Sequence, residues 1–133
     1  MRRLATPSFK FKVYTMKKLT IKRAYEPADK TDGMRILVDR LWPRGVSKKD
    51  AHIDLWLKEV APSVPLRKWF AHDPEKWDEF RRKYRHELKH NPALDELKDT
   101  IEKYGNTTLI YAAHDVEHNH AVVLLQYLEE ASK

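Results

Sequence analysis

Three strand-like segments and a series of helix start signals follow one another in an order that allows few folds. Residues 19–25 (LTIKRAY) alternate apolar and polar side chains, as a half-buried strand does. Residues 34–39 form a short apolar run typical of a buried strand, and residues 107–113 (TTLIYAA) are apolar and rich in β-branched side chains. Helical segments separate the second strand from the third, and another helix follows the third. This order predicts one α/β domain with a small, mostly parallel sheet flanked by helices.

Capping residues and prolines indicate where the helices begin and end. Asp73 and Asn91 are each followed by proline, which combines an N-cap residue with a proline at the first helical position. Ser47 is the expected N-cap of an earlier helix that ends at Pro62, and Gly105 is expected to stop the helix that Asn91 begins. A short helix is expected at residues 66–72, and the last helix is expected to be capped by Asp115 or Asn119.

Apolar residues at helical spacing predict which faces of these helices are buried. The early helix would carry Ile53, Trp56, Leu57 and Val60, and the helix after Asp73 would bury Trp77, Phe80, Tyr84 and Leu88. Lys76, Arg82 and Lys83 do not share that stripe and are expected to face water.

Length and composition exclude several classes of protein. With 133 residues the chain fits one domain, and it has no run of about 18 apolar residues that could cross a membrane. A soluble, cytoplasmic protein is therefore expected, without membrane association. The absence of cysteine excludes disulfide scaffolds, thiolate zinc sites and cysteine nucleophiles.

The positive charge is concentrated at the start of the chain. The formal charge is +6, but residues 1–25 hold eight Lys and Arg and no acidic residue. Residues 26–133 carry 18 basic and 20 acidic side chains and are nearly neutral. Residues 1–16 are therefore expected to be a basic extension outside the domain at 17–133, upstream of a translation start at Met16; a phosphate-binding arm or a targeting segment would have the same composition.

Polar residues follow each predicted strand. Because the carboxyl ends of parallel strands share one edge of a sheet, ligands of such folds bind there. Arginine offers a rigid fork for carboxylate or phosphate, and a carboxylate or histidine can transfer protons. Asp39 and His114 are the candidate catalytic residues at this edge. The candidate ligand-binding residues are Arg23, Tyr25, Arg40, Trp42, Arg44, Asp115 and Asn119.

Each of these residues also has a purely structural interpretation. Asp39 could pair with Arg23 or Arg40 to hold the strand ends together. Trp42 could stack on a base or sugar, or it could cover the core.

Motif searches give no cofactor. His114 and His118 are four residues apart, but they do not match the two-histidine zinc helix, and no metal site is expected. With only 3 glycines the chain has neither the dinucleotide-binding fingerprint nor a P-loop, so no nucleotide cofactor is expected by those routes.

Three longer segments carry a family resemblance. They are DRLWPRG at 39–45, LRKWFAHDPEKWDEFRRKYRHEL at 66–88 and TLIYAAHDVEHNHAVVLLQYL at 108–128. In these segments the chain resembles the YeaO-like family of small bacterial and archaeal proteins of unknown function (domain of unknown function 488). The resemblance covers about residues 19–130 and implies no established activity. Longer proteins similar to this family have EHCHR where this chain has Glu117-His118-Asn119-His120-Ala121, so thiol chemistry is not expected here.

Besides a partner-binding module without chemistry, two more specific functions remain open. The first is a polar, anion-accepting pocket at the strand ends that binds a small phosphorylated or carboxylated molecule and acts on it as an enzyme. The second is a nucleic-acid-associated or regulatory protein that uses the basic leader and the DRLWPRG segment. Phosphate-backbone binding weakens steeply with salt, which separates the two.

Overall fold

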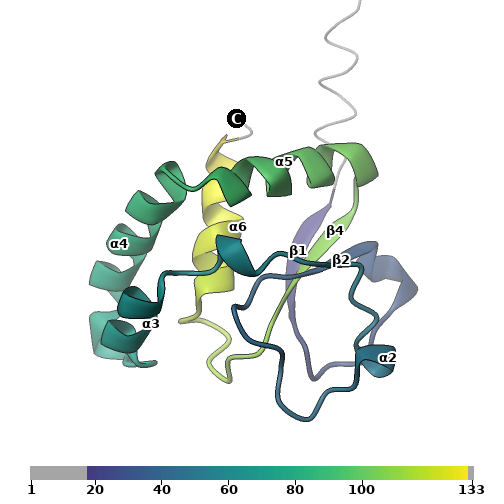
Figure 1. Cartoon of the computed structure of the whole chain (residues 1–133), viewed down its shortest axis with the longest axis horizontal. Coiled ribbons are helices and arrows are strands. Elements are labelled where there is room, and N and C mark those ends of the chain that lie inside the picture. Colours follow the sequence, from purple (N-terminus) through teal and green to yellow (C-terminus); the bar gives the residue numbers. More distant parts are fainter. Residues whose placement is uncertain (1–17, 132–133) are drawn as a thin grey trace, which may run out of the picture.

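The computed structural model describes residues 18–131, so the basic extension predicted at 1–16 lies outside the described part. Four parallel strands form one sheet in the order β1-β4-β2-β3 (Figure 1). The strands are β1 (Leu19–Arg23), β2 (Met34–Leu37), β3 (Leu55–Trp56) and β4 (Thr107–Tyr111). The predicted α/β class and parallel sheet are confirmed.

β4 lies between β1 and β2 and is buried along its whole length. Leu19 of β1 pairs with Thr107, and the register continues to Arg23 opposite Tyr111. On the other side of β4, Leu37 of β2 pairs with Ile110. The three strands therefore end at the same edge of the sheet, as the sequence predicts.

The long helix predicted after Ser47 does not form. Ser47 does cap a helix, α2 (Lys48–Ala51), but His52 follows in the left-handed conformation with φ of 50° and ends it. Leu55 and Trp56 then pair with β2, and a 3-10 turn, η3 (Lys58–Val60), follows. The prediction was wrong because apolar residues that alternate along a short strand and then occupy a turn can imitate helical spacing.

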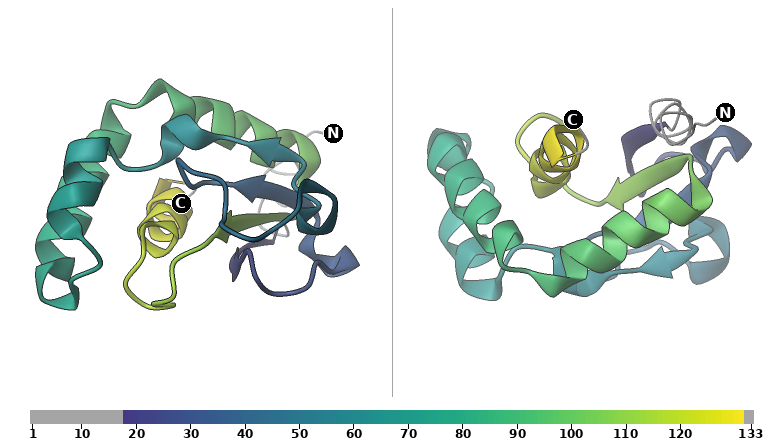
Figure 2. Two further views of the ribbon diagram at one scale, coloured as in Figure 1. Left: turned by 60° about the horizontal axis from the view of Figure 1, so that its bottom comes forward. Right: turned by 90° about the horizontal axis from the view of Figure 1, so that it is seen from above.

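The remaining helices form close to their predicted positions, although the helix expected at 66–72 begins two residues earlier, where the Ser63 side chain caps it. They are α3 (Val64–Phe70), α4 (Trp77–Lys89), α5 (Pro92–Tyr104) and α6 (His120–Ala131). The Asn91 side chain accepts a hydrogen bond from the Ala93 N–H at the start of α5. Asp73 caps a 3-10 turn, η4 (Pro74–Lys76), that leads into α4. Figure 2 shows α4, α5 and α6 as three separate rods around the sheet.

The two faces of the sheet are covered differently. Ile36 and Leu109 point to one face and belong to a large core cluster that includes apolar residues of α3, α4, α5 and α6. Leu37 and Ile110 point to the opposite face, where a smaller cluster includes Trp42, Ile53 and Trp56. Loops rather than long helices thus cover the second face. No helix among residues 18–131 has both the length and the apolar character needed to cross a bilayer.

Candidate functional site

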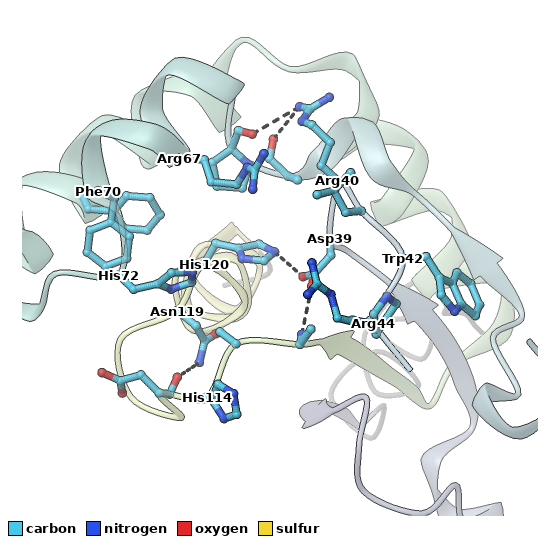
Figure 3. Close-up of a pocket in the computed structure, with 18 of the residues that line it drawn as sticks. Asp39, Arg40, Trp42, Arg44, Arg67, Phe70, His72, His114, Asn119 and His120 are labelled. Carbon is cyan, nitrogen blue, oxygen red and sulfur yellow. Dashed lines mark hydrogen bonds and ion pairs between the residues drawn. The ribbon is translucent and has the colours of Figure 1, made fainter. Parts of the chain in front are cut away.

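A pocket of about 650 Å³ opens at the carboxyl edge of the sheet (Figure 3). The segments after β2 and β4 form one side of it, and α3 with the residues that follow it forms another. The charged and histidine side chains in its lining are Asp39, Arg40, Arg44, Arg67, His72, His114, Asp115 and His120.

Asp39 joins three elements at the base of this pocket. Its Oδ2 accepts a hydrogen bond of 3.0 Å from the Ala112 N–H, just after β4. Its Oδ1 lies 3.2 Å from Nε2 of His120, the first residue of α6. Asp39 is therefore paired with a histidine and a backbone amide, and not with Arg23 or Arg40.

His120 lies in the polar segment that was expected near the pocket after the third predicted strand, but it was not among the candidate catalytic or ligand-binding residues. Its Nε2 is 3.0 Å from the Val38 carbonyl oxygen as well as 3.2 Å from Asp39. Because the carbonyl oxygen can only accept a hydrogen bond, Nε2 must carry a proton. Asp39 and Val38 thus hold the imidazole in one orientation at the pocket wall.

Three arginines line the pocket, Arg40 and Arg44 from the segment after β2 and Arg67 from α3. Arg40 donates to the carbonyl oxygens of Ala61 and Pro62 at 3.4 and 3.3 Å, and its ion pair with the exposed Glu59 is long, at 3.6 Å. Arg44 and Arg67 are exposed and have no acidic partner among residues 18–131. Two guanidinium groups at the pocket are thus free to bind an anion.

Arg23, Tyr25 and Trp42 hold loops in place. Arg23 donates from Nε to the Ala113 carbonyl oxygen at 2.8 Å and does not line the pocket. Tyr25 donates its hydroxyl to the Arg44 carbonyl oxygen, which fixes the backbone that carries this arginine. Trp42 is half-buried, donates to the Val46 carbonyl oxygen and packs edge-on against Trp56.

The loop between β4 and α6 has its own hydrogen bonds. Asp115 accepts from the Glu117 and His118 N–H groups and contacts the His118 ring at 2.9 Å. The Glu117 amide, followed by the His118 side chain and amide, lowers the pKa of Asp115. Asn119 is buried, accepts from the Val122 N–H and donates to the Asp115 carbonyl oxygen, so its amide caps α6. His114 is exposed at the pocket and makes no hydrogen bond with the described residues.

Arg67, Phe70 and His72 also line the pocket, although the sequence analysis placed no functional residue in this segment. They lie on and just after α3, far along the chain from the strand ends at which the ligand-binding residues were expected. Among residues 18–131, no group of three or more His, Asp or Glu side chains could hold a metal ion.

Fold and site together define a small α/β protein with an all-parallel four-stranded sheet and an arginine-lined pocket at its carboxyl edge. The chain belongs to the DUF488 family, since residues 18–133 match the family model described as "Inactive DUF488-N3 subclade".

Two relatives support this assignment. An uncharacterized protein of Mycobacterium tuberculosis is 42% identical over 111 residues, which is 84% of this chain and 93% of the relative. The uncharacterized protein YeaO of Escherichia coli is 44% identical over 107 residues, 80% of this chain and 93% of the relative. The expected resemblance to the YeaO-like family is therefore confirmed. No solved structure matches the chain.

Proposed function

We propose that this protein binds a small phosphorylated or carboxylated molecule in the pocket at the carboxyl edge of its sheet. The observation that carries the proposal is the set of three pocket arginines, Arg40, Arg44 and Arg67, of which two have no acidic partner among residues 18–131. A guanidinium fork matches the geometry of phosphate and carboxylate oxygens.

The charges around the pocket favour an anion over a cation. The lining has three arginines against two carboxylates, and each carboxylate lies beside a histidine, Asp39 beside His120 and Asp115 beside His118. Neither carboxylate forms an ion pair with Arg44 or Arg67 among residues 18–131. An anionic ligand would supply the missing negative charge.

The proposal is one of binding, because the residues first considered for chemistry are engaged elsewhere or lack a partner that would activate them. Asp39 accepts from the Ala112 amide and pairs with His120, and Asn119 caps α6. Among residues 18–131, no ion pair or hydrogen bond joins the His114 side chain to an acid or a base. The word "Inactive" in the description of the matching subclade agrees with this view.

Calorimetric titration with inorganic phosphate tests the proposal. We expect saturable binding by the unmodified chain, and a loss of about tenfold in affinity in each of R44Q and R67Q, because each removes one charged donor. R81Q is the matched control, since Arg81 is exposed on α4 and lies outside the pocket lining. An equal loss in R81Q, or no effect of R44Q and R67Q, would contradict the proposal.

The same variants discriminate against nucleic-acid binding. Phosphate-backbone binding by a basic surface would be lost steeply as salt rises and would weaken in R81Q as well. The packing of Trp42 against Trp56 and its hydrogen bond to Val46 make base stacking by this indole less favourable.

A further inference from the structure

One short segment gives the pocket both a cation and aromatic rings. Arg67 and Phe70 lie on α3, and His72 follows two residues after the helix ends. Figure 3 shows Phe70 and His72 on the same side of the pocket, with the His72 ring directed towards its interior. The pocket therefore has an aromatic wall next to its charged groups.

His72 is held in an unfavourable backbone conformation. Ala71 and His72 both have positive φ angles, 47° and 57°, which are uncommon for residues other than glycine. Hydrogen bonds from Ala71 N–H to the Arg67 carbonyl oxygen and from Asp73 N–H to the Phe70 carbonyl oxygen maintain this turn. The His72 ring makes no hydrogen bond with the described residues and contacts the Phe70 ring, with ring centres 6.4 Å apart.

The aromatic side chains behind His72 are packed against one another. Phe70 stacks on Phe80 with ring centres 4.1 Å apart, and Phe80 in turn stacks on Tyr84 at 5.8 Å. Phe70 and Phe80 are almost fully buried, while His72 is exposed and tilted next to Phe70. A ligand at this wall would contact the exposed His72 ring next to the stacked Phe70 and Phe80 side chains.

The size of the pocket also exceeds what an isolated anion needs. A volume of about 650 Å³ lies within the range of roughly 300–1,000 Å³ that holds drug-sized ligands. Phosphate or carboxylate bound to Arg44 or Arg67 would leave most of this space for another part of the same molecule. The aromatic wall indicates what that part is.

We propose that the anionic ligand of this pocket carries a flat aromatic ring, as an aryl phosphate does, and that the ring stacks on His72 while the anionic group binds Arg44 and Arg67. This inference rests on the proposed function. Stacking on aromatic side chains favours binding of a flat π-system over binding of a puckered ring of similar size. His72 is thus a specificity-determining residue for the ring, and the arginines determine the charge.

Three probe molecules separate the contribution of the aromatic ring to binding from that of the anionic group. We expect phenyl phosphate to bind at least about tenfold more tightly than cyclohexyl phosphate, and both to bind more tightly than inorganic phosphate. In H72N the preference for phenyl over cyclohexyl phosphate should fall towards one, because asparagine tolerates the left-handed conformation but has no ring. H72F should retain the preference.

Two controls guard against a general loss of structure. H52N changes another histidine with positive φ, which directly follows α2 and lies outside the pocket lining, and should leave all three affinities unchanged. The affinity of H72N for inorganic phosphate should also be unchanged. Equal binding of phenyl and cyclohexyl phosphate would overturn the inference on the ring and leave the proposed function standing. If none of the three probes binds, the proposed function fails, and the inference fails with it.

Discussion

Asp32, just before β2, is only 8% exposed, yet its surroundings favour the ionised carboxylate. Arg35 donates to it at 2.6 Å and Lys22 at 3.0 Å, and the Asp29 N–H donates at 3.0 Å. Burial alone would raise its pKa, but the Asp29 amide with the Lys22 and Arg35 side chains outweighs burial and lowers it. Arg35 is itself buried and also donates to the Ala51 carbonyl oxygen, so the carboxylate connects three segments.

We expect D32N to lower the free energy of unfolding at neutral pH by about 3 kcal/mol, because it leaves the buried Arg35 without its counter-charge. Urea denaturation measures this loss. D99N, a change at an exposed position of α5, should alter the free energy by less than about 0.5 kcal/mol. A similar small change in D32N would show that the ion pairs contribute nothing.

Because the pKa of Asp32 is lowered, this carboxylate should make the protein less stable as the pH falls. Its folded pKa is below the ordinary value of 3.8, so the stabilisation is complete above that pH and is lost as the pH falls through the folded pKa. The difference in unfolding free energy between the unmodified chain and D32N should therefore shrink as the pH falls below about 4. Urea denaturation at successive pH values measures it, and a difference that stays constant would contradict the assignment.

At the scale of elements, α4 is the helix whose sequence pattern and structure agree most fully. Phe80, Tyr84 and Leu88 are 2%, 0% and 1% exposed, whereas Arg82 and Lys83 are exposed, as the helical stripe predicts. Trp77 and Lys76 are half-buried, and the Lys76 ammonium donates to the Trp69 carbonyl oxygen. Tyr84 also donates its hydroxyl to the Val60 carbonyl oxygen, which ties α4 to η3.

We expect F80A to lower the free energy of unfolding by about 3–5 kcal/mol, because it removes a ring that stacks on Phe70, Trp77 and Tyr84 and leaves a cavity. Chemical denaturation gives the value. R81A, one residue along and exposed, is the control. A loss of less than about 1 kcal/mol in F80A would be inconsistent with the packing of α4.

Elements with local signals are predictable from the sequence, and elements that depend on a partner are not. Asn91 with its proline and Gly105 mark α5 correctly, since capping is a property of neighbouring residues. β3 is two residues long and exists because Leu55 and Trp56 pair with β2, which no local pattern reveals.

The same distinction applies to the candidate site. Asp39, Arg40, Arg44 and His114 could be placed at one sheet edge from strand order alone. Arg67 and His72 reach the pocket only because α3 and α4 fold back beside that edge, which is a tertiary contact. His120 follows β4 and is expected near the same edge, but its contact with Asp39 is visible only in the structure.

At the scale of the whole molecule, the pocket is lined by parts of the chain that lie far apart in sequence. Its lining runs from Tyr25 through the exit of β2 and α3 to the start of α6. A ligand bound there contacts segments far apart in sequence and should stabilise the domain as one unit, because binding to the native state alone raises its stability.

We expect phenyl phosphate at about 100 times its dissociation constant to add about 2.7 kcal/mol, which corresponds to a rise in Tm of about 10 °C for a domain of this size. Differential scanning calorimetry measures the shift. R81Q should show the same rise, and the double variant R44Q/R67Q at the same ligand concentration should show little of it. Two separate transitions in the presence of ligand would contradict a single cooperative unit.

The position of β4 between β1 and β2 also determines when the protein can fold during its synthesis. β1 and β2 do not pair with each other, and the strand that lies between them is made only after more than a hundred residues have been joined. Until Thr107–Tyr111 emerges, β1 has no strand to pair with and β2 can pair only with the two residues of β3, so the sheet that buries their apolar residues is incomplete. A nascent chain that ends before β4 should therefore remain sensitive to proteases, and its exposed strands are the segments on which a chaperone would act.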